Sequence, residues 1–198
     1  MIFVVAGTVG SGKTVYAVSL MLQSLSVGDL VSSNIRLHSD EVTKRMGGEG
    51  WKNRYFFLDE DEILNYGAWP VGAARGSGGN LRSLIVIDEA AEWFDAVGAD
   101  KDDLERLVSW LRHSDKQGCD VCLVVQHWGM LHRRLRMLVA VYFHGRNLSE
   151  WKIPGLGFKL PLMRGFTFFS QLDRDARTSL SSPILFYRPE YYRFYDTS

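Results

Sequence analysis

The chain has 198 residues, of which 46% are hydrophobic and 23% are charged, a length and composition typical of a single globular domain. Its 23 Lys and Arg residues balance 23 Asp and Glu residues, so a globally basic nucleic-acid-binding protein is unexpected, although a local basic patch remains open. Two cysteines exclude a disulfide framework, and no segment reads as a signal peptide or membrane span, so we expect a soluble chain in a reducing compartment.

Buried strands and amphipathic helices are predicted to alternate along the first 150 residues. The apolar run 2–6 predicts a strand buried on both faces, and the helical spacing of apolar residues over 13–25 predicts a helix packed on that sheet. Residues 67–80 are expected to form a long glycine-rich loop. The pattern also predicts a helix over 102–113 and strands over 30–35, 55–58, 84–87, 121–125 and 137–143.

The sequence changes character after Trp151, where prolines separate short β-rich runs such as 166–169 and 184–187. We therefore predict an α/β fold with a parallel sheet flanked by helices. Residues 1–150 should form its core. Residues 151–198 should be a β-rich extension packed on that core, within the same domain.

A phosphate-binding motif, G-x-x-x-x-G-K-[ST], lies between the first predicted strand and helix. Its glycines allow a tight loop whose N–H groups surround phosphate oxygens, and the following helix adds its positive N-terminal dipole. The lysine would reach the β- and γ-phosphates of ATP, and the last hydroxyl would bind Mg²⁺. The motif predicts that the core 1–150 is a P-loop NTPase. The alternative is a glycine-rich turn without a ligand. The motif consists of Gly7, Thr8, Val9, Gly10, Ser11, Gly12, Lys13 and Thr14.

An acidic pair, Asp88 and Glu89, follows the apolar strand predicted over 84–87. Ligand crevices of parallel α/β sheets lie at the carboxyl ends of the strands, so Asp88 should face the phosphate loop. We expect Asp88 to hold Mg²⁺ with Thr14, and Glu89 to activate the attacking water as general base. Either carboxylate could instead cap a helix that begins at Ala90.

Gln126 and several arginines are further candidates for the site. Gln126 ends the apolar strand 121–125, where its amide could sense the γ-phosphate or simply bind the backbone. Arg112, near the end of the predicted helix 102–113, could project into the site of a neighbouring subunit. The arginines could equally form a solvated basic face or contact nucleic-acid phosphates. The basic cluster consists of Arg133, Arg134, Arg136 and Arg146.

Cys119 and Cys122 form a C-x-x-C motif near His127. In a strand, positions i and i+3 face opposite sides, so these thiols are poorly placed to share a metal. A redox pair would ordinarily open a helix. We therefore expect both cysteines to be structural. We also expect no metal site among His113, His127, His132 and His144, which lack ligand spacing on one element.

Taken together, these motifs resemble those of the N-terminal ATPase domain of the zonular occludens toxin family, also known as the filamentous-phage gene I assembly proteins. The matching landmarks are G-T-V-G-S-G-K-T at 7–14, Ser33-Asn34-Ile35, L-I-V-I-D-E-A at 84–90, Trp93-Phe94, Arg112-His113, Asp120, Gln126, the segment 131–136, and Phe194-Tyr195-Asp196-Thr197. The phosphate loop and the acidic pair are shared by many ATPases, whereas Arg112-His113 followed by Asp120 and Gln126 is more particular.

The resemblance implies a RecA-like fold of the group that includes FtsK-like and HerA-like DNA-pumping ATPases. It implies an ATP- and Mg²⁺-dependent assembly ATPase of the bacterial inner membrane, with this domain in the cytoplasm. Expected partners are further copies in a ring and phage assembly or export proteins, with single-stranded phage DNA as another candidate. Family members continue into a membrane-spanning helix and a periplasmic part, so we expect an excised domain that ends near Ser198.

Three functions are open from the sequence. The first is an oligomeric NTPase that moves phage DNA or coat protein, which explains Glu89 and Gln126 best. The second is a small-molecule kinase with the loop 67–79, including Arg75, as a lid. The third is a docking module ordered by nucleotide, which would bind ATP without needing Glu89.

Overall fold

One sheet of eight strands organises the part of the chain that the structure describes. The structure is a computed structural model, and it describes residues 1–73, 81–94, 101–147, 162–169, 184–186 and 189–196. The strand order is β3-β2-β4-β5-β1-β6-β7-β8. The strands are β1 (Ile2–Ala6), β2 (Leu30–Ser33), β3 (Tyr55–Phe57), β4 (Ser83–Ile87), β5 (Cys119–Val125), β6 (Val141–Asn147), β7 (Leu162–Phe169) and β8 (Ile184–Phe186).

The strands from β3 to β6 run parallel, whereas β7 and β8 continue the sheet in antiparallel pairing. Parallel strands require crossover connections, which helices supply here, and two of these helices, α1 and α5, were predicted from the sequence. The helices are α1 (Lys13–Val27), α2 (Ser39–Met46), α3 (Glu60–Leu64), α4 (Ala91–Phe94), α5 (Lys101–His113) and α6 (Arg133–Arg136). Short 3-10 turns join them: η1 (Glu49–Arg54), η2 (Tyr66–Ala68), η3 (Trp128–Met130) and η4 (Pro189–Phe194).

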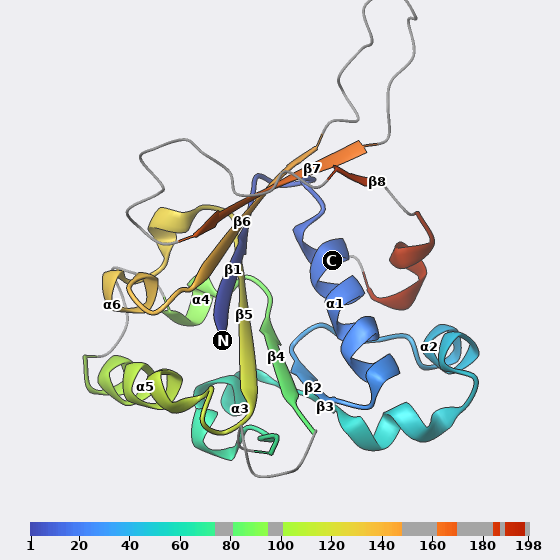
Figure 1. The fold of residues 1–198 in the computed structure, drawn as a ribbon, viewed down its shortest axis with the longest axis horizontal. Helices are drawn as coiled ribbons and strands as arrows, with labels where there is room; N and C mark the ends of the chain where they lie inside the picture. The colour runs from blue at the N-terminus through green and yellow to red at the C-terminus, as the bar shows by residue number, and fades with distance from the viewer. Residues whose placement is uncertain (74–80, 95–100, 148–161, 170–183, 187–188, 197–198) are drawn as a thin grey trace, which may run out of the picture.

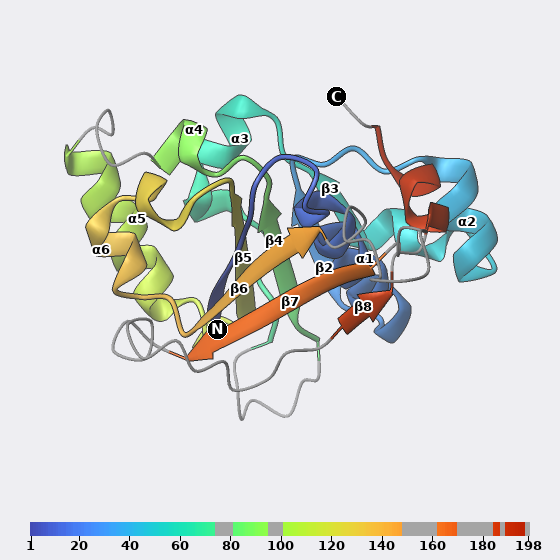
Figure 2. The ribbon, with the colours of Figure 1, turned by 90° about the horizontal axis from the view of Figure 1, so that it is seen from above.

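Helices cover both faces of the parallel strands (Figures 1 and 2). Successive strand residues point to opposite faces, so β1 contributes Ile2, Val4 and Ala6 to one apolar core and Phe3 and Val5 to the other. The first core packs against α5 and its neighbours, and the second against α1 and α2. Burial on both faces explains why the central strands are almost continuously apolar, and the predicted α/β fold is confirmed.

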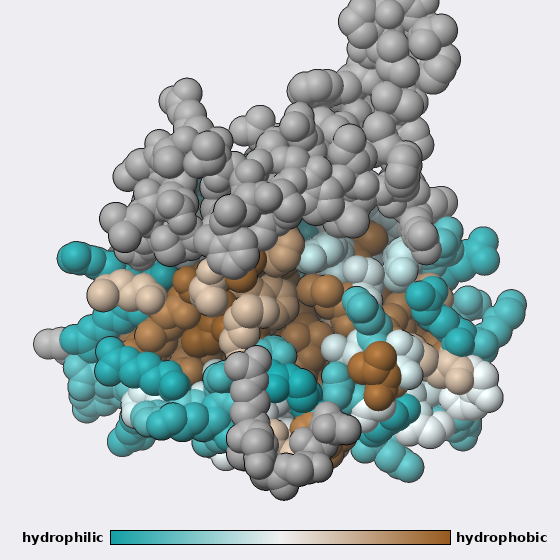
Figure 3. Space-filling view, in the orientation of Figure 1, coloured by the Kyte–Doolittle hydropathy of each residue, from teal (hydrophilic) through white to brown (hydrophobic). Residues whose placement is uncertain are grey.

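Hydrophilic side chains cover the outer sides of the peripheral helices, and an apolar area lies between them on the same face (Figure 3). In α5, for example, Leu104, Leu107 and Leu111 are buried, whereas Arg106 and Arg112 are exposed. The helix thus presents one apolar stripe to the sheet. Within the described residues, no helix combines the length and the hydrophobicity that crossing a membrane requires.

Several predicted strand boundaries differ from the structure by one to four residues, and two of these differences have a clear local cause. β2 ends at Ser33 rather than Ile35, because the Ser33 hydroxyl accepts a hydrogen bond from the Ile35 N–H at 3.0 Å and turns the chain. The strand predicted over 137–143 begins only at Val141, because Met137 closes α6 and Leu138 follows in a hydrogen-bonded turn. The loop expected over 67–80 is described only through Ala73, so Arg75 lies outside the described residues, as does much of the expected extension 151–198.

Candidate functional site

The phosphate loop leaves the carboxyl end of β1 and leads directly into α1. Gly10 and Gly12 have φ angles of 75° and 82°, in the left-handed region that glycine adopts most easily. Gly12 is the residue before α1, and no side chain caps that end of the helix. The positive end of a 15-residue helix therefore opens into the loop.

Lys13 is the charged group of this loop and is only 7% exposed. Its Nζ donates to the Thr8 carbonyl at 3.4 Å, and no carboxylate of the described residues forms an ion pair with it. The Ser11 hydroxyl, also in the loop, is buried without a hydrogen-bond partner in the described part of the chain. A buried cation and an unpartnered hydroxyl beside a helix N-terminus are suited to binding an anion.

The acidic pair lies against the start of α1. The Thr14 hydroxyl donates to Asp88 Oδ2 at 2.8 Å, which brings together the two side chains that the sequence predicts as metal ligands. Burial raises the pKa of Asp88 above the usual carboxyl value, and the Thr14 hydrogen bond opposes that shift. Glu89 donates its N–H to Asp88 Oδ1 at 3.0 Å and has a φ of 47°, an uncommon conformation for a residue other than glycine.

Gln126 and Arg112 lie near opposite ends of β5: Gln126 follows its carboxyl end, and Arg112 lies near its amino end. β5 is paired with β4, so Gln126 leaves β5 beside the acidic pair, and its Nε2 donates to Glu89 Oε2 at 3.4 Å. Arg112 instead lies in the last turn of α5, before the amino end of β5. The structure therefore brings Gln126 to the site and does not bring Arg112 to the site of its own chain.

Asn34 is a site residue that the chemical reasoning from sequence missed, although it belongs to a family landmark. It follows β2, the other neighbour of β4. Its Nδ2 donates to the Asp88 carbonyl at 2.9 Å, and its Oδ1 accepts from the Asp88 N–H at 2.8 Å. Apart from the family landmark, the only signal was a polar residue directly after a short strand, and the strand order is needed to place it beside Asp88.

A cavity of about 610 Å³ lies against the phosphate loop, the acidic pair and Asn34, and Gln126 is not among the residues that line it. From the predicted site, Val9, Gly10, Lys13, Thr14, Asp88 and Glu89 line it. The remaining charged lining residues are Arg36, Glu92 and Asp196, so four carboxylates face two cations. Tyr195 and Asp196 come from the end of the described chain, and no chemical pattern in the sequence indicated that they reach this cavity.

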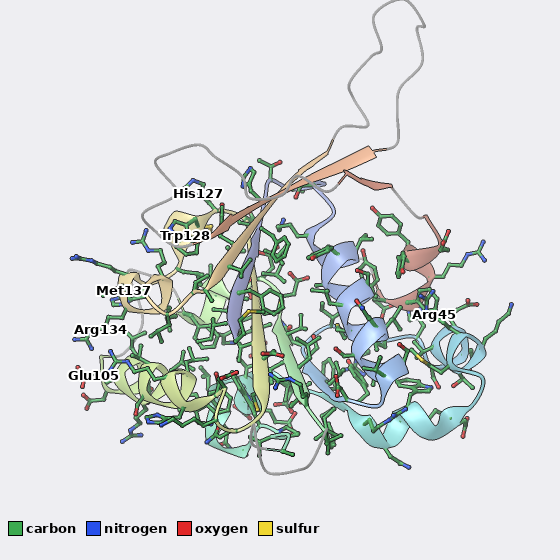
Figure 4. The ribbon with its side chains drawn as sticks, viewed as in Figure 1. Arg45, Glu105, His127, Trp128, Arg134 and Met137 are labelled. Carbon is green, nitrogen blue, oxygen red and sulfur yellow. The ribbon has the colours of Figure 1, made fainter. Side chains whose placement is uncertain are left out.

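The other candidate sites have structural explanations. Arg134 on α6 pairs with Glu105 on α5 at 2.7 Å, so part of the basic cluster ties two helices together (Figure 4). Cys119 and Cys122 are buried and unpaired, and they belong to the two different cores. Among the described residues, no group of three or more His, Cys, Asp or Glu side chains is arranged to hold a metal ion.

Comparisons with known proteins fit this geometry. A family model described as Zonular occludens toxin (Zot) matches residues 1–164. The Gene 1 protein of Enterobacteria phage I2-2 is 25% identical over 170 residues, which are 83% of this chain and 45% of that protein. The chain thus spans about half the length of this relative.

Two solved structures share the fold. The N-terminal domain of zonular occludens toxin from Neisseria meningitidis matches with a TM-score of 0.60 and 20% identity, covering 98% of each chain. The genome packaging NTPase B204 from Sulfolobus turreted icosahedral virus 2, in complex with ATP-gammaS, matches with a TM-score of 0.52 and 10% identity, covering 92% of this chain and 95% of that one. At such identities the likeness establishes the NTPase fold alone.

Proposed function

The chain belongs to the zonular occludens toxin (Zot) family, and from that premise we propose that it is the ATP-binding and ATP-hydrolysing part of a phage assembly or export protein. Relatives named as phage Gene 1 proteins support the phage connection, and the fold shared with a genome packaging NTPase supports nucleotide hydrolysis. The expected inner-membrane location belongs to the same proposal.

The observation that carries the proposal is the environment of Lys13. A lysine that is 7% exposed ordinarily requires an anionic partner, and no carboxylate of the described residues forms an ion pair with it. The uncapped start of α1 and the unpartnered Ser11 hydroxyl lie in the same loop. The phosphates of ATP would satisfy all three groups. In this assignment the loop 7–14 surrounds the phosphates and Lys13 neutralises the β- and γ-phosphates.

The donor set beside the loop fits Mg²⁺. Thr14 and Asp88 offer a hydroxyl and a carboxylate oxygen, the hard ligands that Mg²⁺ prefers, and the cavity lining carries two more negative than positive side chains. Thr14 and Asp88 would hold the ion, which when bound supplies positive charge to the phosphates. The 2.8 Å hydrogen bond between the two side chains supports this pairing.

Glu89 is the residue we assign to proton transfer. In hydrolysis, water attacks the γ-phosphorus, the bond to the bridging oxygen breaks, and ADP leaves. The Glu89 carboxylate accepts the proton of the attacking water, and Gln126 orients Glu89 through its 3.4 Å contact. Because Arg112 lies on α5 near the amino end of β5, away from the site at the carboxyl end, it could act only on a neighbouring copy in a ring. Phage DNA and other export proteins remain proposed partners.

The test is hydrolysis of Mg·ATP by the purified chain at increasing protein concentration. We expect Lys13→Ala to lose nucleotide binding, and Glu89→Gln to bind ATP without hydrolysing it. Lys116→Ala, an exposed lysine far from the loop, is the matched control and should behave as wild type. A rate per subunit that rises with concentration supports a shared site. Tight ATP binding with equal turnover in wild type and Glu89→Gln would contradict the catalytic assignment and favour a docking module.

A further inference from the structure

The residues after β2 hold the acidic pair in place. Asn34 makes two hydrogen bonds to the backbone of Asp88, one through its amide nitrogen and one through its oxygen. The same stretch is fixed from β3, because the Tyr55 hydroxyl donates to the Ile35 carbonyl. Residues 34–38, which we call the β2 exit segment, are therefore a rigid neighbour of the site.

The other end of the β2 exit segment holds residues 189–196, which we call the carboxyl-terminal segment. Leu37 forms a β-bridge with Tyr195, and the His38 N–H donates to the Phe194 carbonyl at 2.8 Å. The two ring nitrogens of His38 lie 2.8 Å from the Arg193 carbonyl and 2.7 Å from Asp196 Oδ1. Four contacts thus join these two short segments.

The carboxyl-terminal segment is also a wall of the cavity. Tyr195 and Asp196 line it together with Thr14 and Asp88. Phe194 and Tyr195 are buried in the core that includes α1, and the segment lies beside α1 and α2 in both ribbon views (Figures 1 and 2). From α2, the Arg45 guanidinium lies 5.3 Å from the Tyr191 ring centre and 5.5 Å from that of Phe194 (Figure 4).

The His38 contact is the part of this attachment that can open. Its side chain is 42% exposed and that of Asp196 is 70% exposed, so water competes for both groups. The buried aromatic residues, in contrast, remain anchored. Of the two cavity-lining residues of this segment, Tyr195 stays anchored in the core, whereas the Asp196 side chain is held by this exposed pair and can move without disturbing the core.

We propose that the β2 exit segment couples nucleotide binding to docking of the carboxyl-terminal segment, with His38 and Asn34 as positioning residues. Asn34 contacts Asp88 and His38 contacts Asp196, and Asn34 and His38 lie four positions apart on the same short stretch. If nucleotide binds more tightly when the carboxyl-terminal segment is docked on the β2 exit segment, then by linkage nucleotide affinity must fall when the carboxyl-terminal segment is released. The inference rests on the proposed nucleotide site.

The experiment measures binding of Mg·ATPγS and amide hydrogen exchange in the same variants. His38 does not line the cavity, so a change in affinity in His38→Ala must pass through the segments. We expect about five-fold weaker binding in His38→Ala and in Asp196→Asn, with no further loss in the double variant. His38→Arg, which keeps a cation opposite Asp196, should restore affinity. Asp120→Asn is the matched control, because its 2.9 Å pair with Arg82 is remote from the cavity.

Hydrogen exchange separates this inference from the proposed function. Without nucleotide, His38→Ala should speed exchange at the Asp88 amide, which depends on Asn34, as well as in residues 189–196. With nucleotide, exchange in residues 189–196 of the wild type should slow. Wild-type binding with no change in affinity or exchange in the variants would overturn the coupling alone. Failure of the wild type to bind any nucleotide would overturn the proposed function and the coupling together.

Discussion

At the scale of single residues, Asp88 is the most constrained group of the site. The Thr14 hydroxyl and the Glu89 N–H each donate to its carboxylate, and Asn34 fixes its backbone on both sides of the Cα atom. Such neighbours matter because a ligand group that is free to rotate loses part of its affinity for a metal ion. The geometry of Asp88 therefore depends on one residue after β2, one after β4 and one in the first turn of α1.

Asn34→Asp tests this dependence. The new carboxylate cannot donate to the Asp88 carbonyl, and it adds a negative charge beside a buried acid whose pKa is already raised by burial. We expect kcat for Mg·ATP to fall about ten-fold or more, with a higher Mg²⁺ requirement. Steady-state kinetics over a range of Mg²⁺ concentrations measures both effects. Asn65→Asp, an exposed asparagine after α3, is the control, and equal kinetics in the two variants would contradict the role of Asn34.

Glu89 combines a proposed catalytic side chain with an unfavourable backbone conformation. Its φ of 47° costs a residue with a side chain about 1 to 2 kcal/mol. Glycine removes that strain. Glycine also loses more backbone entropy on folding, which offsets about 0.5 to 1 kcal/mol of the strain energy that is relieved. Glu89→Gly should therefore be more stable than Glu89→Gln in urea unfolding, by up to about 1.5 kcal/mol, while both lack hydrolysis. A Gly variant that is less stable than the Gln variant would show that the backbone here is unstrained.

At the scale of elements, the phosphate loop is packed against β6 as well as against α1. A Cβ atom at Gly7 would meet the Ser11 hydroxyl and lie 2.6 Å from the Gly145 carbonyl in β6. The same addition at Gly10 meets nothing, although its φ is 75°. Gly7 is limited by space as well as by its φ of 159°, whereas Gly10 is limited by conformation alone.

Gly7→Ala and Gly10→Ala should separate these two limits. Overpacking against backbone costs about 1 to 3 kcal/mol, so Gly7→Ala should lower the free energy of unfolding by about that amount and shift the loop. Gly10→Ala should cost about 1 kcal/mol. Chemical unfolding of both variants measures the difference. A Gly7→Ala variant with wild-type stability would mean that the loop and β6 are not in close contact.

The link between the β2 exit segment and the carboxyl-terminal segment should depend on pH. The hydrogen bond with Asp196 raises the pKa of His38 above 6.5, the Arg193 carbonyl and the nearby Glu41 act in the same direction, and desolvation opposes them. A raised pKa in the folded state means that protonated His38 contributes stability below about pH 6.5, and that this contribution is lost as the pH rises through the higher folded value.

The measurement is the difference in melting temperature between wild type and His38→Gln at several pH values. We expect the wild type to be more stable than the variant at about pH 6 and this advantage to shrink at about pH 8. Asp196→Asn should remove most of the pH dependence, because it removes the main cause of the pKa shift. If the stability advantage of the wild type over His38→Gln grew with pH instead, protonated His38 would not be the stabilising form, and its pairing with Asp196 would be excluded.

Most elements of the core could be predicted because their signals are local. The apolar run before Gly7 and the periodic residues after Lys13 each specify one element and its boundary. The strand expected over 137–143 exists as β6, but its predicted start was too early, because Leu138 and Val139 pack against the core from a turn and apolar residues in a turn resemble a strand in sequence. Neither Asn34 nor Tyr195 could be assigned a role, since each acts on residues far along the chain.

At the scale of the whole molecule, two apolar cores share one sheet, and each contains one buried cysteine. Cys119 faces the core with α5, and Cys122 faces the core with α1. The sequence predicted that these thiols point to opposite faces, because they lie three positions apart in a strand, and the structure confirms it. They are therefore natural probes of whether the two layers open together.

Because every central strand contributes to both cores, we expect the layers to unfold as one cooperative unit. Thiol labelling of the single-cysteine variants Cys119→Ala and Cys122→Ala, in denaturant below the unfolding transition, measures this directly. Both thiols should react at the rate of global opening, and Mg·ATP should slow both equally, since a ligand of the native state stabilises the whole unit. Labelling of the fully unfolded variants supplies the intrinsic rates. Faster labelling at Cys119 than at Cys122, with only the latter protected by nucleotide, would mean that the α5 layer opens independently of the layer that carries the phosphate loop.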